Sequence, residues 1–323
     1  MSMKIGYIGT LGHGGTAFAG KLPCTFIGVA AGCEADAASS RSLAESKGIP
    51  FFERWEDLLR EKPDACVVNT VYGLNQKIAL ACLNAGIHVY CEKPAAISLE
   101  ELDELEAVIH SENAPLYFSM LTERFEPCFY TARKLLDAGA VGEIRMLTAQ
   151  KSYKLGTRPA FYKERSLYGG TIPWVAIHMI DQILWLSGLS VEDTRAWQSR
   201  LANGGNGSME MTTMLQMRLS GEVLASVHAD FLRPQNAPTH GDDRIRVAGT
   251  KGILEVRGSQ VYLIDDTNNG TEPMPLEQTE QIFDAFIRLC GNKSARKDSI
   301  YRDFGALRST RAALLARNSA DRA

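Results

Sequence analysis

The sequence predicts an α/β protein in which a doubly wound domain with a parallel sheet precedes an α+β domain with a largely antiparallel sheet. Two observations predict this class. Over residues 1–120, short apolar runs alternate with helical patterns, which is typical of parallel strands joined by right-handed crossovers. From Val191 onward, extended runs dominate. The length of 323 residues also suits two domains of about 150 residues each, and we place the boundary at residue 121.

Short apolar runs predict the strands of the first domain, and the segments between them have helical patterns. Ser98, with Glu101 three positions later, has the pattern of a capping box at the start of one helix. Gly86 supplies a stop signal for the helix before it. The expected strands are 4–8, 25–31, 51–52, 65–69, 87–91 and 116–120, and the expected helices are 39–47, 55–59, 75–85 and 98–110.

The second domain begins with helices and continues as a meander of strands. Two extended runs, 209–219 and 222–231, meet at Ser220-Gly221, which we interpret as a two-residue hairpin turn. A helix follows Gly169-Gly170, and the final helix, 300–317, could pack back on the first domain. The other expected elements are a helix at 127–138 and strands at 144–152, 245–248, 253–256 and 261–264.

Composition and charge exclude several classes of protein. Lys and Arg total 35 against 38 Asp and Glu, so the net charge of −3 gives no basic field for nucleic acid or an anionic membrane. No apolar run approaches the ~18 residues of a membrane span, and the N-terminus runs into a glycine-rich turn rather than a secretory signal. The 7 cysteines form no C-x-x-C pair, which indicates reduced thiols and a cytoplasmic protein. No zinc-ligand spacing, G-x-S-x-G elbow or H-E-x-x-H motif occurs, so we expect no metal site.

A glycine turn directly after the first strand predicts a dinucleotide site. Gly9, Gly12 and Gly14 would let the backbone approach a pyrophosphate, and the following helix would point free N–H groups at it. Their spacing is G-x-x-G-x-G rather than G-x-G-x-x-G, so a plain tight turn is the alternative. A P-loop is disfavoured because Gly15 stands where that motif needs lysine. The expected cofactor contacts in this turn are Gly9, Thr10, Leu11, Gly12, His13 and Gly14.

The sequence leaves the choice between NAD and NADP open. A carboxylate that binds the adenine ribose should come about 20 residues after the first glycine, and no acid stands at 29–32. Glu34 and Asp36 come slightly late, whereas Arg41 could instead meet a 2′-phosphate.

Glu92-Lys93-Pro94 follows a strand in the region where an α/β sheet holds its ligand. This triplet is one of a series of motifs that occur in order along nearly the whole chain. Together with the glycine turn, the series resembles the Gfo/Idh/MocA oxidoreductases. The motifs are AGIHVYCEKP at 85–94, Arg124-Phe125-Glu126-Pro127, AGAVGEI at 138–144, Gly169-Gly170 followed by His178-x-x-Asp181, and ARNSADR at 316–322.

The resemblance implies a Rossmann NAD(P)-binding domain at 1–120 and a substrate and oligomerisation domain with an open-faced sheet at 121–323. Family members typically oxidise a secondary alcohol of a sugar or cyclitol, or run the reverse reduction. The resemblance assigns Lys93 to the substrate oxygen and the developing alkoxide, and His178 is the candidate general base. The alternatives are a solvated surface charge for Lys93 and a core histidine for His178. The further expected cofactor contacts are Thr70, Val71, Asn75, Glu92 and Lys93.

Two positions depart from the pattern of the family. Relatives usually carry Asp four residues before the histidine, one helical turn away, and this chain has Trp174 there. Without that carboxylate, His178 is a weaker base, relies on Asp181 or a neighbour, or is not catalytic. The Trp174 indole could instead stack on a sugar ring. Asn75 stands where relatives often have His, and its amide could still contact the cofactor.

The expected substrate is a small carbohydrate or polyol, in contact with Arg124, Tyr162, Trp174 and Asp181. Two other functions stay open. One is a cofactor-binding sensor or scaffold that has lost the chemistry, and the other is an NAD-dependent glycosidase that uses the redox step internally. Relatives commonly pair through the exposed sheet face, so a homodimer or homotetramer is expected. Met209, Met211, Met214 and Met217 could supply that face or fill the core.

Overall fold

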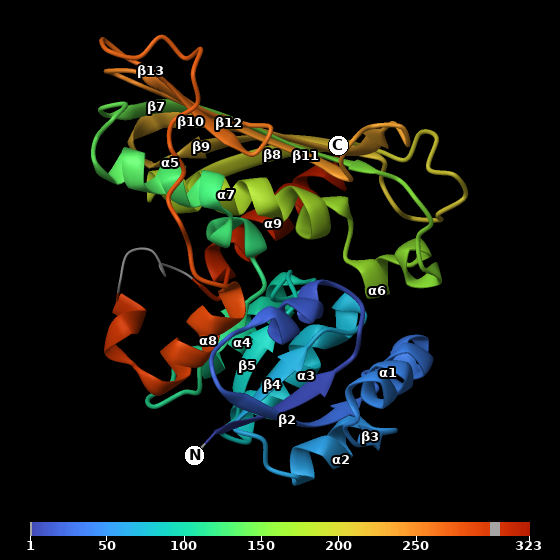
Figure 1. Ribbon diagram of the computed structural model, residues 1–323. Coiled ribbons are helices and arrows are strands. Elements are labelled where there is room, and N and C mark those ends of the chain that lie inside the picture. Colours follow the sequence, from blue (N-terminus) through green and yellow to red (C-terminus); the bar gives the residue numbers. More distant parts are fainter. Residues whose placement is uncertain (1, 298–303) are drawn as a thin grey trace. The chain divides into compact units, whose positions relative to one another are not determined.

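The computed structural model describes residues 2–297 and 304–323, which form two compact units. The first, here called the Rossmann unit, comprises Met1–Thr122, Ser166–Gly169 and Glu280–Thr310. The second, here called the sheet unit, comprises Glu123–Arg165, Gly170–Thr279 and Arg311–Ala323. Each unit is built on one sheet (Figure 1), and the structure confirms the predicted α/β class. Among the described residues, no helix combines the length and the hydrophobicity needed to cross a bilayer.

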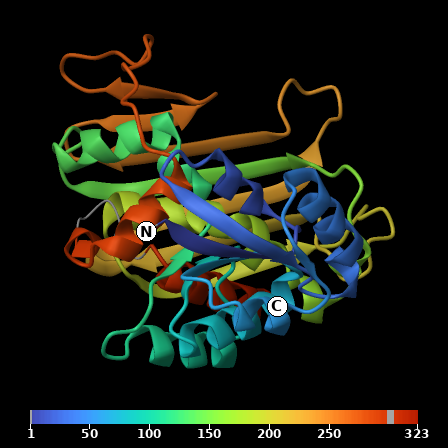
Figure 2. The same ribbon diagram turned by 60° about the horizontal axis from the view of Figure 1, so that its bottom comes forward.

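The Rossmann unit holds a six-stranded parallel sheet in the order β3-β2-β1-β4-β5-β6. Its central strand β4 is buried at every residue, as expected for a parallel sheet covered on both faces. The helices η1 and α1 cover one face, and α3 and α4 cover the other (Figure 1, Figure 2). The strands are β1 (Met3–Ile8), β2 (Cys24–Ala30), β3 (Phe51–Phe52), β4 (Ala65–Val68), β5 (His88–Cys91) and β6 (Tyr117–Ser119). The helices are η1 (His13–Ala19), α1 (Glu34–Lys47), α2 (Trp55–Arg60), α3 (Tyr72–Asn84), α4 (Leu99–Ile109), α8 (Ile282–Gly291) and η6 (Ser294–Lys297), with α6 (Arg165–Tyr168) at the junction of the units.

The start of α4 follows from the predicted capping residues. Ser98 is the N-cap, and its Oγ accepts a hydrogen bond from Glu101 N at 3.1 Å. The Glu101 carboxylate reaches one residue beyond the expected box, since its Oε2 accepts from Ile97 N at 2.9 Å. Both bonds satisfy backbone donors that the first helical turn leaves open.

The helix α8 was not predicted, and it belongs to the Rossmann unit although it comes late in the chain. The ring centroids of Phe283 and Phe286 each lie 5.3 Å from that of Tyr90 on β5. Asp284 Oδ1 accepts hydrogen bonds from Lys21 N at 2.7 Å and Leu22 N at 2.8 Å, just after η1. Aromatic packing and these two bonds therefore join α8 to the first strands of the chain.

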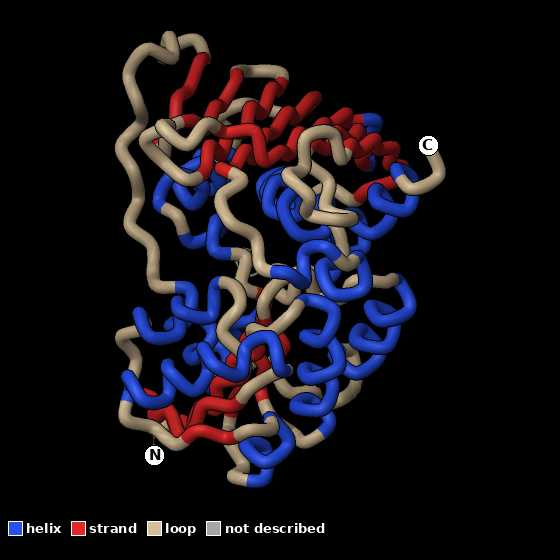
Figure 3. The backbone as a smooth tube through the Cα atoms, turned by 90° about the vertical axis from the view of Figure 1, so that its right-hand side faces the viewer, coloured by secondary structure: helices blue, strands red, loops and turns tan. Residues whose placement is uncertain are grey.

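The sheet unit holds a seven-stranded sheet in the order β13-β12-β11-β7-β10-β9-β8. Neighbouring strands are antiparallel except for the parallel pair β7 and β10. Buried and exposed side chains alternate along β9, so one face of the sheet is covered and the other is open. In this unit α5 and α7 lie on one face, and the described residues place no helix on the other (Figure 1, Figure 3). The strands are β7 (Ile144–Lys154), β8 (Val191–Ser199), β9 (Thr212–Leu219), β10 (Val223–Arg233), β11 (Gly241–Gly249), β12 (Ile253–Arg257) and β13 (Gln260–Ile264). The helices and turns include η2 (Thr122–Phe125), α5 (Pro127–Asp137), η3 (Ala160–Lys163), a π-helical segment η4 (Ile172–Ala176), α7 (Ile177–Ser187), η5 (Ser220–Glu222) and α9 (Leu307–Ala320).

The hairpin between β9 and β10 has a three-residue turn, so the predicted two-residue turn is wrong. Leu219 pairs with Val223, which leaves Ser220 to Glu222 outside the ladder. Gly221 at φ 74° and Glu222 at φ 61° both adopt left-handed conformations. Two consecutive left-handed residues, one of them not glycine, give a turn that the Ser-Gly signal did not indicate.

Two other expectations meet the structure only in part. Of the expected final helix, residues 300–303 lie outside the described residues, and α9 begins at Leu307. The four methionines divide between core and surface. Met209, Met211 and Met217 are buried, whereas Met214 is 50% exposed on the open face of the sheet.

Candidate active site

Neighbouring strand ends bring several of the expected cofactor residues together at one edge of the Rossmann sheet. β1 leads into the glycine turn, β4 into Asn69 and Thr70, and β5 into Glu92-Lys93. Leu11 N donates to Asn69 O at 2.7 Å, which joins the first two ends. Thr70 N donates to Asn75 Oδ1 at 3.0 Å, so the Asn75 amide orders its own loop. The carboxyl ends of adjacent parallel strands are the ordinary ligand site of such a sheet.

The turn after β1 requires glycine because other backbone and side-chain atoms lie very close to it. Gly9 has a φ of 75°, and a Cβ there would lie 2.6 Å from Asn69 O. A Cβ on Gly12 would collide with the Glu92 carboxylate, and one on Gly14 would collide with the Asn69 amide. The spacing G-x-x-G-x-G therefore reflects how closely this turn packs on the ends of β4 and β5.

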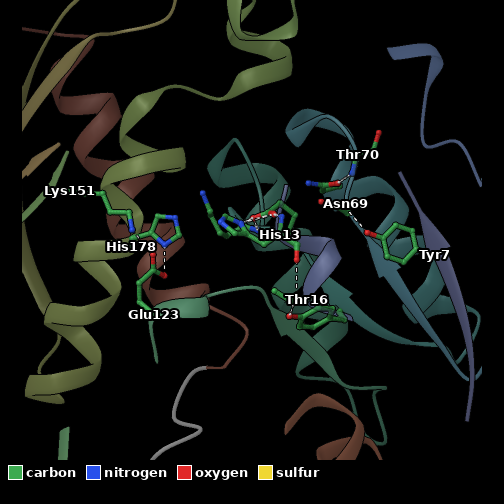
Figure 4. Close-up of polar contacts among 12 residues, drawn as sticks. Tyr7, His13, Thr16, Asn69, Thr70, Glu123, Lys151 and His178 are labelled. Carbon is green, nitrogen blue, oxygen red and sulfur yellow. Dashed lines mark hydrogen bonds and ion pairs between the residues drawn. The ribbon is translucent and has the colours of Figure 1, made fainter. Parts of the chain in front are cut away.

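Glu92 fastens the glycine turn to β5. Its buried carboxylate accepts a hydrogen bond from His13 N and lies 3.0 Å from His13 Nδ1 (Figure 4). Its other oxygen accepts from Lys93 N at 2.9 Å. Burial alone would raise the pKa of Glu92, but His13 and the charge of Lys93 outweigh it and hold the pKa below its ordinary value. Glu92 is thus an anion inside the protein.

Lys93 is itself buried, with 1% of its surface exposed. The alternative of a solvated surface charge is therefore wrong for this lysine. A buried ammonium beside a buried carboxylate is an uncommon arrangement for a residue without a function.

The glycine turn offers backbone donors that fit a pyrophosphate. Within the described part of the chain, the N–H groups of Thr10 and Gly12 form no hydrogen bond. Asn69 Oδ1, which would lie 2.9 Å from a Cβ on Gly12, is buried without a hydrogen-bond partner among the same residues. Open donors on a glycine-lined surface are what a dinucleotide phosphate needs.

Hydroxyl groups of Tyr7, Thr16 and Tyr90 lie against the segments that flank the turn, and no sequence motif predicted them. Tyr7 OH accepts from Asn69 Nδ2 at 3.4 Å, and Thr16 Oγ1 lies 2.8 Å from Tyr90 OH (Figure 4). Burial raises the pKa of both tyrosines well above the ordinary value, so the hydroxyls stay neutral. They are positioned to orient η1 and the end of β4.

The first turn of α1, which follows β2, contains a buried acid. Asp36 is fully buried, and its Oδ1 accepts from Gly32 N at 2.8 Å. Its Oδ2 accepts from the Thr70 hydroxyl, which ties the end of β2 to the end of β4. Arg41, which could have met a 2′-phosphate, instead pairs with Glu53 and lies over the Phe51 ring at 4.3 Å.

In the sheet unit, His178 lies at the end of a chain of buried charges. Its Nδ1 lies 2.6 Å from Glu123 Oε2 (Figure 4). Glu123 Oε1 accepts from Lys151 Nζ at 2.6 Å, and the same ammonium donates to Asp243 Oδ2 at 2.6 Å. These residues come from α7, η2, β7 and β11, so the fold and not the local sequence assembles them.

The charges of this cluster support one another. Burial alone would raise the pKa of Glu123, but His178 and Lys151 outweigh it and hold the pKa well below its ordinary range. Burial would likewise lower the pKa of Lys151, yet the carboxylates of Glu123 and Asp243 hold it well above the ordinary value. Glu123 and Lys151 are therefore both charged at neutral pH.

Arg124 and Asp181, both expected to contact substrate, bind each other. Arg124 Nε and Nη2 donate to the two Asp181 oxygens at 2.7 Å and 2.5 Å, and both side chains are buried. The expectation that Asp181 orients the His178 ring is wrong, because the Asp181 carboxylate is directed to the guanidinium and Glu123 meets Nδ1. The spacing of three residues indicated a shared helix face and could not reveal Arg124 as a competing partner.

Tyr162 and Trp174, the remaining expected substrate contacts, are largely buried, with 4% and 8% of their surface exposed. The Tyr162 ring lies 4.7 Å from that of Phe161, and the Arg158 guanidinium lies 5.6 Å from its centroid. Trp174 lies in the π-helical segment η4, where its backbone N–H donates to Gly170 O at 3.1 Å. Both aromatic residues precede the helix of His178 in the sequence.

Comparison with known proteins matches both halves of the chain. Residues 3–119 match the model of the oxidoreductase family with an NAD-binding Rossmann fold, and residues 129–255 match the GFO/IDH/MocA C-terminal domain. The chain belongs to the Gfo/Idh/MocA oxidoreductase family. The resemblance drawn from the sequence motifs is thereby confirmed.

Individual members of the Gfo/Idh/MocA family differ in how much of this chain they match. A solved structure from Thermotoga maritima, described only as an oxidoreductase, is 42% identical, covers 99% of this chain and 98% of its own, and has a TM-score of 0.92. Inositol 2-dehydrogenase of Rhizobium meliloti (strain 1021) is 28% identical over 66% of this chain. Glucose-fructose oxidoreductase domain-containing protein 2 of Xenopus laevis is 26% identical over 69% of this chain. The matches span 63% and 60%, respectively, of the length of these two curated relatives.

Proposed function

We propose that the chain transfers hydride between a bound nicotinamide dinucleotide and a secondary alcohol or ketone of a sugar, cyclitol or related polyol. Membership of an NAD-binding oxidoreductase family supports the chemistry, and the likeness to inositol 2-dehydrogenase supports a polyol substrate. The observation that carries the proposal is the glycine turn, which has open N–H groups and is fastened by buried Glu92 next to buried Lys93.

The Rossmann unit would hold the dinucleotide by its glycine turn and the neighbouring strand ends. Thr10 and Gly12 would donate to the pyrophosphate, and His13 and Glu92 would fix the turn. The proposed contacts are Gly9, Thr10, Leu11, Gly12, His13, Gly14, Thr70, Val71, Asn75, Glu92 and Lys93. The bound nicotinamide supplies the hydride acceptor or donor.

Lys93 and His178 would supply the remaining chemistry. The Lys93 ammonium steadies the substrate oxygen and the negative charge that grows on it. His178 takes the hydroxyl proton during oxidation and returns it during reduction. Tyr162 and Trp174 are proposed to stack on the substrate ring, while Arg124 and Asp181 brace the helix of His178 through their ion pair.

We further propose that NAD is preferred to NADP. The buried Asp36 carboxylate lies in the first turn of α1, after β2, and accepts from Gly32 N, so it would repel a 2′-phosphate there. Arg41 is held by Glu53 and Phe51 and is not available to such a phosphate without breaking both contacts. Titration calorimetry with each cofactor tests this, and equal affinity would contradict it.

The experiment for the proposed function combines that titration with a screen of sugars and inositols for change in NADH absorbance. Binding of dinucleotide with turnover of a polyol supports the dehydrogenase. Trp174, in place of the usual acid, favours a second candidate: a cofactor-binding sensor, which would bind tightly and turn over no polyol. Product without net NADH would indicate the glycosidase instead. Absence of binding to any nicotinamide dinucleotide would refute all three.

A further inference from the structure

We propose that Glu123 is the positioning residue for His178 and takes the role of the acid that position 174 lacks. This inference deepens the proposed function and rests on it where it speaks of catalysis. The observation behind it is a buried carboxylate at hydrogen-bond distance from the imidazole, contributed by η2, 55 positions earlier in the chain.

The contact fixes which ring nitrogen can exchange a proton with substrate. An ionised carboxylate only accepts hydrogen bonds, so the 2.6 Å contact requires a proton on His178 Nδ1. Neutral His178 then presents Nε2 as its basic atom. When Nε2 takes a proton, Glu123 stabilises the resulting imidazolium by charge, as an aspartate does in a Ser-His-Asp triad.

Lys151 keeps Glu123 ionised, and Asp243 holds the Lys151 ammonium from its other side. Lys151 Nζ lies 2.6 Å from Glu123 Oε1, and Asp243 Oδ2 lies 2.6 Å from Lys151 Nζ on its other side. Lys151 and Glu123 are each at most 4% exposed, so neither charge is screened by water. The carboxylate is therefore held at both oxygens, one by a cation and one by the base that it serves.

Three other titratable groups, Glu126, Tyr153 and Asp181, have pKa shifts or contacts of their own. Burial and the charge of Glu123 raise the pKa of Glu126 to about 7. The Tyr153 hydroxyl is neutral, because burial raises its pKa well above the ordinary value. Asp181, the acid nearest to His178 in sequence, is bound to Arg124 through both oxygens. Glu123 is the carboxylate that contacts the imidazole directly.

The test compares E123Q with D181N by NMR of protein labelled with ¹⁵N-histidine, with H178N used only to assign the resonance. E123Q removes the charge at nearly constant volume and leaves Lys151 beside the ring. We expect the titration of His178 to move to lower pH by about one unit or more, because the imidazolium has lost its counter-charge. D181N should lower the thermal unfolding temperature and leave the His178 titration in place.

The kinetic companion is the pH profile of kcat/KM with a polyol from the screen. E123Q should lower kcat/KM about a hundredfold at neutral pH, with the acidic limb moved to lower pH. E123D keeps the negative charge but places it one methylene further from the ring. It should therefore restore part of kcat/KM and move the acidic limb part of the way back. A variant that is merely destabilised would lower the unfolding temperature without moving the limb.

Three results would overturn the proposal. The first is a His178 titration that E123Q leaves unchanged, and the second is a shift of that titration in D181N instead of E123Q. The third applies if E123Q does not fold: E123D then has the same His178 titration and the same kcat/KM as wild type. The NMR measurement needs no turnover. If E123Q moves the titration but calorimetry detects no dinucleotide, the positioning role stands and the proposed function falls.

Discussion

At the scale of single residues, Lys93 shows how burial can turn an ordinary side chain into a candidate catalytic group. Its side chain is buried and its charge helps to hold the pKa of Glu92 below the ordinary value, and methionine has a similar length without the charge. We expect K93M to lower kcat about a thousandfold, because the growing alkoxide loses its cation. Dinucleotide affinity measured by calorimetry should fall much less than kcat does. K77M, the same exchange at an exposed site of α3, is the matched control, and substantial turnover in K93M would remove Lys93 from the chemistry.

Glu126, immediately before α5, predicts a pH dependence of stability. Burial first, and then the charges of Glu123 and Asp243, raise its pKa from 4.5 to about 7. The folded protein therefore binds the proton of the Glu126 carboxyl more tightly than the unfolded chain does. The stability that this tighter binding contributes is lost as pH rises from about 5 to about 7. In E126Q that contribution no longer depends on pH.

Urea unfolding at pH 5 and pH 8 measures the difference. The free energy of unfolding of E126Q minus that of wild type should be larger at pH 8 than at pH 5. The increase should be at most about 3 kcal/mol, which is the full pKa shift of Glu126 converted to free energy. The same exchange at exposed Glu143 should show no such gain. A pH-independent difference between E126Q and wild type would mean that Glu126 titrates normally in the folded protein.

The sequence indicated those site residues that lie in recognisable motifs and missed those that only the fold brings together. Glu92-Lys93-Pro94 and the glycine turn could be recognised because each is a continuous segment at a strand end. Glu123 could not be assigned, since it reaches His178 from a short turn 55 positions away. Asn69 was expected only as the last residue of the strand 65–69, yet its amide and carbonyl contact Tyr7 and Leu11.

At the scale of elements, strands that are apolar along their whole length were predicted well, because burial on both faces leaves a continuous signal. β4 and β5 lie within one residue of their expected bounds. The helix α8 was missed because its aromatic partners on β5 and β6 lie more than 160 positions earlier in the chain. The structure of the β9–β10 turn depends on a left-handed Glu222, for which the sequence had no signal.

The glycine turn gives a prediction at this scale. G12A places a methyl group against the Glu92 carboxylate, and the buried pair with His13 must shift to admit it. Overpacking of this kind costs about 1–3 kcal/mol, so thermal unfolding should begin several degrees lower. G15A changes a neighbouring glycine whose Cβ would meet nothing within 4 Å, and it should unfold at the wild-type temperature. Equal unfolding temperatures for G12A and G15A would show that the turn does not pack on Glu92 as described.

At the scale of the whole molecule, the open face of the sheet unit exposes four large apolar side chains. Trp197 and Met214 pair across β8 and β9 and are 52% and 50% exposed. Leu224 and Met146 pair across β10 and β7 and are 57% and 43% exposed. The alternation along these strands places all four on one face, and apolar patches of this kind mark interaction surfaces.

We propose that a second copy of this chain covers that face, in a homodimer or a homotetramer built from such pairs. Light scattering during size-exclusion chromatography should give at least twice the chain mass of 35.5 kDa at micromolar concentration. W197E places a charge on this face, where burying it without a partner costs several kcal/mol, so the assembly should dissociate. L22E changes an exposed leucine of the Rossmann unit and should leave the mass unchanged. A wild-type protein that elutes with the mass of one chain would contradict the proposed pairing through this face.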